Sequence, residues 1–186
     1  MKRFILFLLA LTLSLSFAAC NGDDAPINGG ESEEGESQSA ALDIESEADY
    51  VIEKYSLSGG KRYSSSSQAE GGYLDEELIR SYYGDSASMP DFSSVEAYCV
   101  YIDESQPINP CEFGIFKMKG GANTEEFMLY LKARINLKLQ NAVAYPTMDT
   151  EALETAVFTE KDGYIWYFVV KGGNSEINNY LEGKLD

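Results

Sequence analysis

The stretch that decides the fold is residues 95–118, VEAYCVYIDESQPINPCEFGIFKM. Residues 95–102 and 111–118 are both rich in apolar and aromatic side chains, which is typical of strands. Residues 103–110 between them are mostly polar and contain two prolines, which do not continue a strand. We therefore predict two antiparallel strands joined by a loop.

A long helix is predicted after this pair of strands. Gly120-Gly121 separates it from the second strand, and Thr124 or Asn123 is the expected N-cap. The helix runs from Thr124 to about Ala142, and Tyr145-Pro146 ends it, because a residue before proline avoids the helical conformation.

A second hairpin and helix follow. Residues 155–159 and 164–171 predict strands, and Asp162-Gly163 between them is a strong hairpin signal. Residues 175–185 predict a terminal helix. Two hairpins, each followed by a helix, favour an α+β fold: a four-stranded antiparallel sheet with the helices packed on one face.

A helical segment precedes these two units. Apolar side chains recur at helical spacing in residues 43–56, which predicts a helix. Residues 63–72 are rich in serine and glycine and predict a loop. Residues 75–83 predict a short helix with acidic side chains in its first turn. Residues 42–186 therefore form a single α+β domain in this interpretation.

Residues 1–19 have the layout of an export signal. Lys2 and Arg3 precede an apolar stretch that is too short to span a membrane. Small residues then lead to Cys20, and the segment resembles the signal peptide and lipobox of bacterial lipoproteins, although Phe17 stands where leucine is usual. The resemblance implies that Cys20 carries lipid and holds the chain at the extracytoplasmic face of the cell membrane. The alternative is an ordinary secretory signal followed by a chance cysteine.

An acidic tether is predicted over residues 20–41. Residues 21–49 contain ten acidic residues and no lysine or arginine. Such a segment repels itself and lacks the apolar side chains that a core requires, so we expect it to be disordered. A weak calcium site is the alternative, but residues 31–36 lack the ligand spacing of a calcium loop.

The overall charge excludes several functions. The 186-residue chain has 14 Lys+Arg against 31 Asp+Glu, a net charge of −17, and no histidine. Nucleic-acid binding is excluded because a phosphate backbone requires clustered cations. Without histidine, catalysis by Ser-His-Asp or Cys-His and zinc sites of the HExxH type are also excluded. We predict neither a metal site nor a cofactor.

Cys99 and Cys111 are the cysteines that follow Cys20. If the loop is centred on Ser105, they lie directly opposite each other on one apolar face of the hairpin. Because an exported chain meets oxidising conditions, we predict a disulfide between them. Two buried free thiols are the alternative.

Arg134 and Lys138 fall on the buried stripe of the long helix, which is unusual for cations. Their aliphatic stems would pack on the sheet while the charged ends reach its edge. A second interpretation pairs Arg134 with Glu112 or Glu96 across the helix–sheet interface. In a third, Arg134, Lys138 and Lys117 bind an anionic ligand.

Residues 164–170 are apolar on both faces of the predicted strand, so the second face must also be covered. The 43–56 helix, the serine-rich loop, a partner protein or a small ligand would cover it, and this surface is a candidate binding site. We expect a non-enzymatic binding or accessory module whose partner is an envelope protein or a small molecule. The alternative is a hydrolase or transferase that uses two carboxylates, Glu96 and Glu112.

The chain from residue 82 onward resembles a group of Gram-positive bacterial lipoproteins known as domain of unknown function 4358. The match covers about 105 residues and rests on the order and spacing of short pieces: Tyr83-Gly84, Val95-Glu96-Ala97-Tyr98-Cys99-Val100-Tyr101, Glu112-Phe113-Gly114-Ile115-Phe116-Lys117, Arg134, Tyr145-Pro146, and Thr155-Ala156-Val157 with the hairpin to Val170. Cys99 and Cys111 depart from the family pattern. The resemblance implies a lipid-anchored extracytoplasmic domain and brings no activity with it.

Overall fold

The computed structural model describes residues 41–85, 87–105, 110–142, 144–145 and 147–186. The predicted signal segment 1–19, the lipidation site Cys20 and nearly all of the tether 20–41 lie outside the described residues. Residues 42–186 belong to one compact unit.

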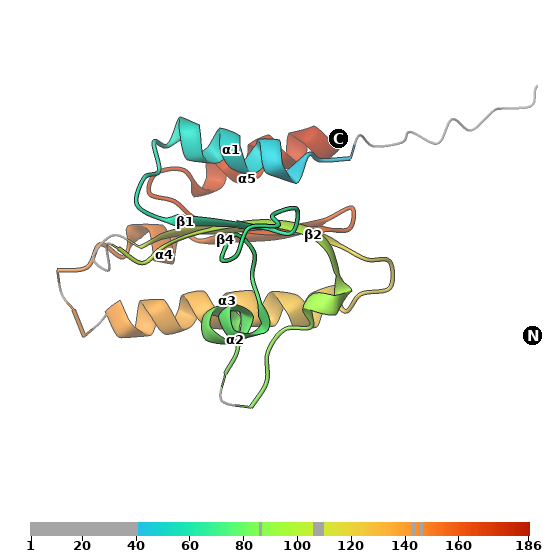
Figure 1. Cartoon of the computed structure of the whole chain (residues 1–186). Coiled ribbons are helices and arrows are strands. Elements are labelled where there is room, and N and C mark those ends of the chain that lie inside the picture. Colours follow the sequence, from blue (N-terminus) through green and yellow to red (C-terminus); the bar gives the residue numbers. More distant parts are fainter. Residues whose placement is uncertain (1–40, 86, 106–109, 143, 146) are drawn as a thin grey trace, which may run out of the picture. The chain divides into compact units, whose positions relative to one another are not determined.

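An antiparallel sheet forms the centre of this unit (Figure 1). In the described part of the chain it has five strands in the order β1-β2-β3-β5-β4. They are β1 (Lys61–Ser64), β2 (Val95–Asp103), β3 (Cys111–Met118), β4 (Val157–Lys161) and β5 (Tyr164–Val169). The α+β class and both predicted hairpins are confirmed, and the hairpins join through β3 and β5.

The prediction of four strands is wrong, because β1 is a fifth. Its serine-rich surroundings resemble a loop, yet Tyr63 pairs with Val100 and Ser64 with Cys99. Glu45 accepts hydrogen bonds from Arg62 and Ser64, which ties the strand to the first helix. The strand therefore depends on its partners, since its own residues have no strand pattern.

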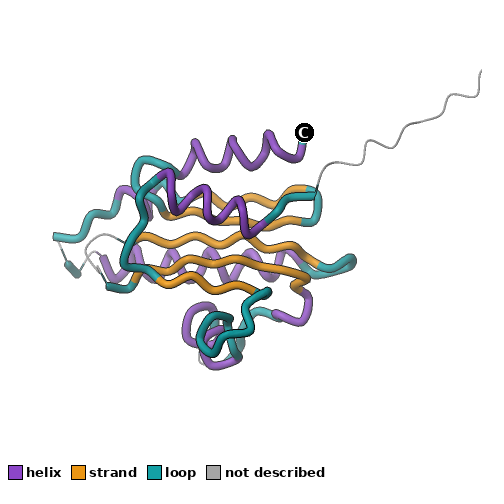
Figure 2. The backbone as a smooth tube through the Cα atoms, turned by 45° about the horizontal axis from the view of Figure 1, so that its top comes forward, coloured by secondary structure: helices purple, strands orange, loops and turns teal. Residues whose placement is uncertain are grey.

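Helices cover both faces of the sheet (Figure 1, Figure 2). The elements are α1 (Ile44–Lys54), α2 (Glu76–Tyr83), the 3-10 helix η1 (Phe92–Ser94), α3 (Thr124–Ala142), α4 (Glu151–Glu154) and α5 (Asn174–Leu185). Helices α1 and α5 lie on one face, and α2 and α3 on the other. The prediction that the two main helices share one face is therefore wrong. The physical reason is that the strands are apolar on both sides, so each side needs its own cover.

The side chains of β5 show this division. Ile165, Tyr167 and Val169 point into the core beneath α2 and α3, while Trp166 and Phe168 point into the core beneath α1 and α5. All of them are fully buried. The second face of this strand, which the sequence marked as a candidate binding surface, is thus occupied by the chain's own helices.

Local signals position several of these elements. The Asn123 side chain accepts a hydrogen bond from the backbone N–H of Glu126 at 3.1 Å, so Asn123 caps α3. Asp43 caps α1 in the same way through Ser46. Asp162 and Gly163 have φ values of 50° and 79°, which is the geometry of the tight turn that joins β4 and β5.

The register of the β2–β3 hairpin differs from the predicted one. Cys99 lies opposite Ile115, and Cys111 lies opposite Asp103. Ile115 and Cys111 are four positions apart on β3, which separates the two cysteines by about 13 Å along the sheet. A disulfide needs Cα atoms within about 7 Å of each other. Both cysteines are free thiols, Cys99 buried and Cys111 half-buried, so this register does not support the predicted pairing.

We predict that Cys99 and Cys111 stay unlinked in oxidising buffer. Burial raises the pKa of both thiols to about 12, so the reactive thiolate is scarce at neutral pH. Alkylation followed by peptide mass spectrometry should modify Cys99 only after denaturation, because its side chain is fully buried. A non-reduced digest that contains a Cys99–Cys111 cross-linked peptide would contradict the register.

Candidate functional site

A fully buried carboxylate lies at the centre of the site. Glu112 is near the start of β3, between Ile102 of β2 and Val169 of β5. Its side chain is 0% exposed and points toward α3. Transfer of an unpaired carboxylate into a protein interior is very costly, so this position requires partners.

Arg134 of α3 is the main partner. Its Nε donates to Glu112 Oε1 at 2.7 Å and its Nη2 donates to Oε2 at 2.7 Å, so the guanidinium binds both carboxylate oxygens. The remaining Nη1 donates to the backbone carbonyl of Tyr82 at 2.9 Å, which connects α2 to the pair. The Arg134 side chain is only 8% exposed. Of the interpretations left open by the sequence, the structure contains the pairing of Arg134 with Glu112.

Aromatic rings enclose the ion pair. The guanidinium carbon of Arg134 lies 5.0 Å from the ring centre of Tyr82 and 5.6 Å from that of Tyr83. Tyr167 donates a hydrogen bond to Glu112 Oε1 at 3.5 Å, and its hydroxyl is 3.0 Å from that of Tyr83. Sequence reasoning missed these three tyrosines, because two of them come from a short helix whose position over the sheet has no local signal.

Lys138 is a second cation on the same carboxylate. It lies one helical turn after Arg134, and its Nζ forms a hydrogen bond with Glu112 Oε2. Its side chain is 26% exposed, so it connects the buried pair with the surface. Lys117 does not join this group: it pairs with Glu96 at 2.7 Å, in an exposed position further along the strands.

The charges hold Glu112 in its ionised form. Burial alone would raise the pKa of the Glu112 carboxyl, but the adjacent Arg134 and Lys138 lower it below its usual value. In turn, the carboxylate raises the pKa of Arg134 above its usual value, despite the burial that opposes this. Burial also raises the pKa of Tyr167 well above its ordinary value. Glu112 and Arg134 are therefore both ionised at neutral pH, whereas the Tyr167 phenol is neutral.

A cavity of about 230 Å³ lies beside Lys138, where α3 ends and α4 packs against it. Its polar wall includes Lys138, Asn141 and Glu104, and its apolar wall consists of Pro110, Met148 and Leu153. Asp103, at the end of β2, completes the lining. The sequence did not reveal this cavity, because α4 was not predicted.

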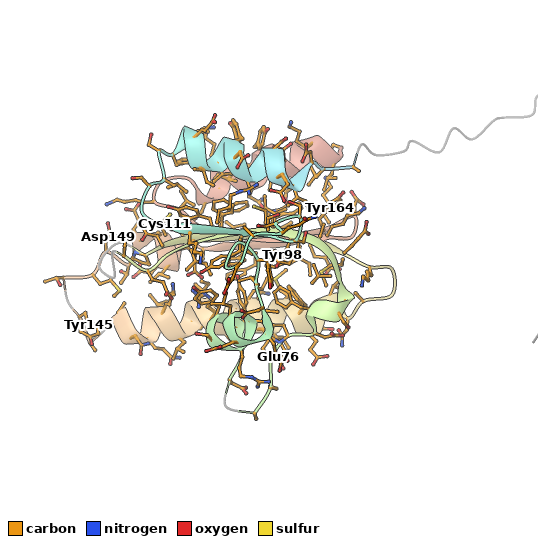
Figure 3. The ribbon with its side chains drawn as sticks, in the orientation of Figure 1. Glu76, Tyr98, Cys111, Tyr145, Asp149 and Tyr164 are labelled. Carbon is orange, nitrogen blue, oxygen red and sulfur yellow. The ribbon has the colours of Figure 1, made fainter. Side chains whose placement is uncertain are left out.

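A second, smaller cavity of about 160 Å³ shares Pro110 with the first. It is lined by Cys111, Tyr55, Asp149 and Lys171, among others. Cys111 and Asp149 lie at the same end of the sheet, whereas Tyr164 lies at the opposite end (Figure 3). Lys171 and Asp149 form an ion pair across this cavity, so its charges are already matched.

The two carboxylates of the alternative enzyme hypothesis are far apart. Glu112 is opposite Ile102, and Glu96 is six positions from Ile102 on the same strand, which corresponds to about 20 Å. Carboxylate pairs in glycosidases are about 5–9.5 Å apart. Arg134 also occupies both oxygens of Glu112. These two residues therefore do not form a catalytic pair.

In the described residues, no group of three or more acidic, cysteine or histidine side chains is arranged to bind a metal ion. No helix in the same residues is both long and apolar enough to cross a membrane.

No protein-family model, no curated protein sequence and no solved structure matches this chain. The likeness to domain of unknown function 4358 therefore stays a prediction from the residues that suggest it.

We predict that Arg134→Ala lowers the free energy of unfolding by about 3–5 kcal/mol, because it leaves the buried Glu112 carboxylate without its main partner. Lys117→Ala is the matched control. Lys117 lies on β3, as Glu112 does, but its ion pair with Glu96 is exposed, so this substitution should lower the free energy of unfolding by less than about 1 kcal/mol. Urea unfolding of both variants checks this. Equal stabilities for the two variants would show that the buried pair does not stabilise the fold.

Proposed function

We propose that this chain is a lipid-anchored protein of the extracytoplasmic face of the cell membrane, and that its folded domain binds a small molecule. The anchor is supported by the segment 1–19, by Cys20 at its end and by the acidic stretch that separates Cys20 from the domain. In this proposal Cys20 carries the lipid, and residues 20–41 are a flexible spacer.

The observation that carries the binding proposal is the cavity beside Lys138. Ligand sites are usually concave and mainly apolar, with a few polar groups that orient the ligand. This cavity has three apolar side chains on one side and Lys138, Asn141 and Glu104 on the other. It also lies against the buried ion cluster, whose rigid contacts hold one of its walls in place.

We predict that the anchor depends on Cys20. Bacteria that express the whole chain and are fed radiolabelled palmitate should produce a labelled protein in the membrane fraction. Cys20→Ala should abolish the label and the membrane retention, while Cys111→Ala, which removes a cysteine inside the domain, should preserve both. Label in the Cys20→Ala protein would contradict the anchor.

We predict that a small molecule raises the melting temperature of the whole chain, purified in mild detergent. A panel of amino acids, organic acids, sugars, peptidoglycan fragments, nucleotides and metals is the screen. A ligand at 100 times its dissociation constant stabilises the folded state by about 2.7 kcal/mol, which is several degrees for a domain of this size.

The control for that screen is a pair of neighbouring substitutions. Asn141→Trp fills the cavity, whereas Gln140→Trp changes the exposed residue beside it, which does not line the cavity. A true ligand should stop stabilising the Asn141→Trp protein and still stabilise the Gln140→Trp protein. If no compound in the panel shifts the wild type, or if Asn141→Trp changes nothing, the small-molecule proposal fails and a protein partner takes its place.

A further inference from the structure

The buried cluster has one positive charge more than it needs. Arg134 binds both oxygens of Glu112, and this pair is already neutral. Lys138 adds a second cation to the same carboxylate. The sum over these three side chains is one excess positive charge, and it lies on Lys138, the one of the three that is partly exposed.

No other carboxylate among the described residues lies within 4.0 Å of Lys138 Nζ. Two acids line the cavity, Asp103 and Glu104, but neither forms an ion pair with Lys138. Asp103 accepts hydrogen bonds from the backbone N–H and the hydroxyl of Ser105. Its Oδ2 lies close to Gly59, at 3.4 Å from the position that a Cβ on this glycine would take. Glu104 is exposed at the rim of the cavity. Among the described residues, Lys138 therefore has a single carboxylate partner, Glu112, which Arg134 already binds through both oxygens.

Burying a cation is unfavourable unless a partner neutralises it. The exposed quarter of Lys138 lines the cavity, and Asn141 lies almost one helical turn further along the same helix. The Lys138 ammonium and the Asn141 amide, which both belong to the lining, are hydrogen-bond donors that suit an anionic oxygen. The opposite wall, formed by Pro110, Met148 and Leu153, suits an apolar group.

We propose that the cavity binds a short aliphatic carboxylate, a deepening that rests on the proposed binding function. The ligand's carboxylate contacts Lys138 and Asn141, and its hydrocarbon part lies against Pro110, Met148 and Leu153. One excess charge matches a monoanion. The cavity is smaller than the sites of drug-sized ligands, which are about 300–1,000 Å³, so the hydrocarbon part is short.

A doubly charged phosphate ester is disfavoured at the same place. Helix α3 ends at Ala142, next to the cavity, and the last carbonyls of a helix carry partial negative charge. Glu104 adds a negative charge at the rim. The end of α3 and Glu104 both repel an anionic ligand. Lys138 compensates this repulsion for one negative charge on the ligand but not for a second.

Calorimetric titration of the whole chain with three probes of the same shape tests this: 4-methylpentanoate, 4-methylpentanamide and 4-methylpentylamine. The carboxylate should bind about tenfold or more tightly than the amide, which is the usual value of one charge-assisted hydrogen bond. The amine should not bind detectably. Equal binding of carboxylate and amide, or preference for the amine, would overturn the assignment.

Variants of two lysines on α3 show which group is responsible. Lys138→Met should weaken carboxylate binding about tenfold or more, and Lys138→Arg should retain it because the charge is kept. Lys132→Met is the matched control: Lys132 is exposed, lies over the Phe158 ring and does not line the cavity, so carboxylate binding should not change. Unaltered affinity in Lys138→Met would overturn the proposal even if 4-methylpentanoate binds.

The failure of this proposal is distinguishable from failure of the binding function. If 4-methylpentanoate does not bind but another compound stabilises the protein in a way that Asn141→Trp blocks, the carboxylate class is wrong and the cavity is still a binding site. If the whole panel is silent as well, both proposals fail together.

Discussion

The carboxylate of Glu112 imposes the strictest constraint on this fold. It is placed in a central strand of a sheet that helices cover on both faces, so water cannot solvate it. Among the described residues, the cations at that point come from α3, and Arg134 must lie directly above Glu112 to bind both of its oxygens. The pair thus fixes where α3 lies along the sheet. Through the carbonyl of Tyr82 the same guanidinium also fixes the end of α2.

The layers around the pair follow from the composition of the strands. The strands β3 and β5 have apolar side chains on both faces, so a sheet covered by helices on one side only would expose an apolar face. Helices α1 and α5 cover the face that α3 does not. Gly114 contributes at the centre of β3: a Cβ there would come within 2.8 Å of the Tyr167 ring and 2.7 Å of the Phe116 ring. The absence of a side chain at Gly114 lets these two rings pack over β3, and the Tyr167 hydroxyl reaches Glu112.

Much of this arrangement was predictable from the sequence, and the failures have physical causes. Asp162-Gly163 marks a turn by its own backbone preference, and cations on the buried stripe of a helix indicate a partner in the sheet. By contrast, β1 is stabilised by β2 and Glu45 and has no strand pattern of its own. The predicted loop centre at Ser105 lies two residues too early, which shifts the β2–β3 pairing by four positions, because a long loop does not fix its own centre. Without that register and without α4, the cavity beside Lys138 was not visible.

The most direct test of this account is a double-mutant cycle between Glu112 and Arg134, with Glu112→Gln, Arg134→Met and the double variant compared by urea unfolding. If the position of α3 depends on this pair, the double variant will be more stable than the sum of the two single effects predicts, by about 2 kcal/mol or more. The reason is that each single variant leaves the other member of the pair charged and without its partner, whereas the double variant removes both charges. Additivity within about 0.5 kcal/mol would show that the two residues contribute independently, and would contradict the account.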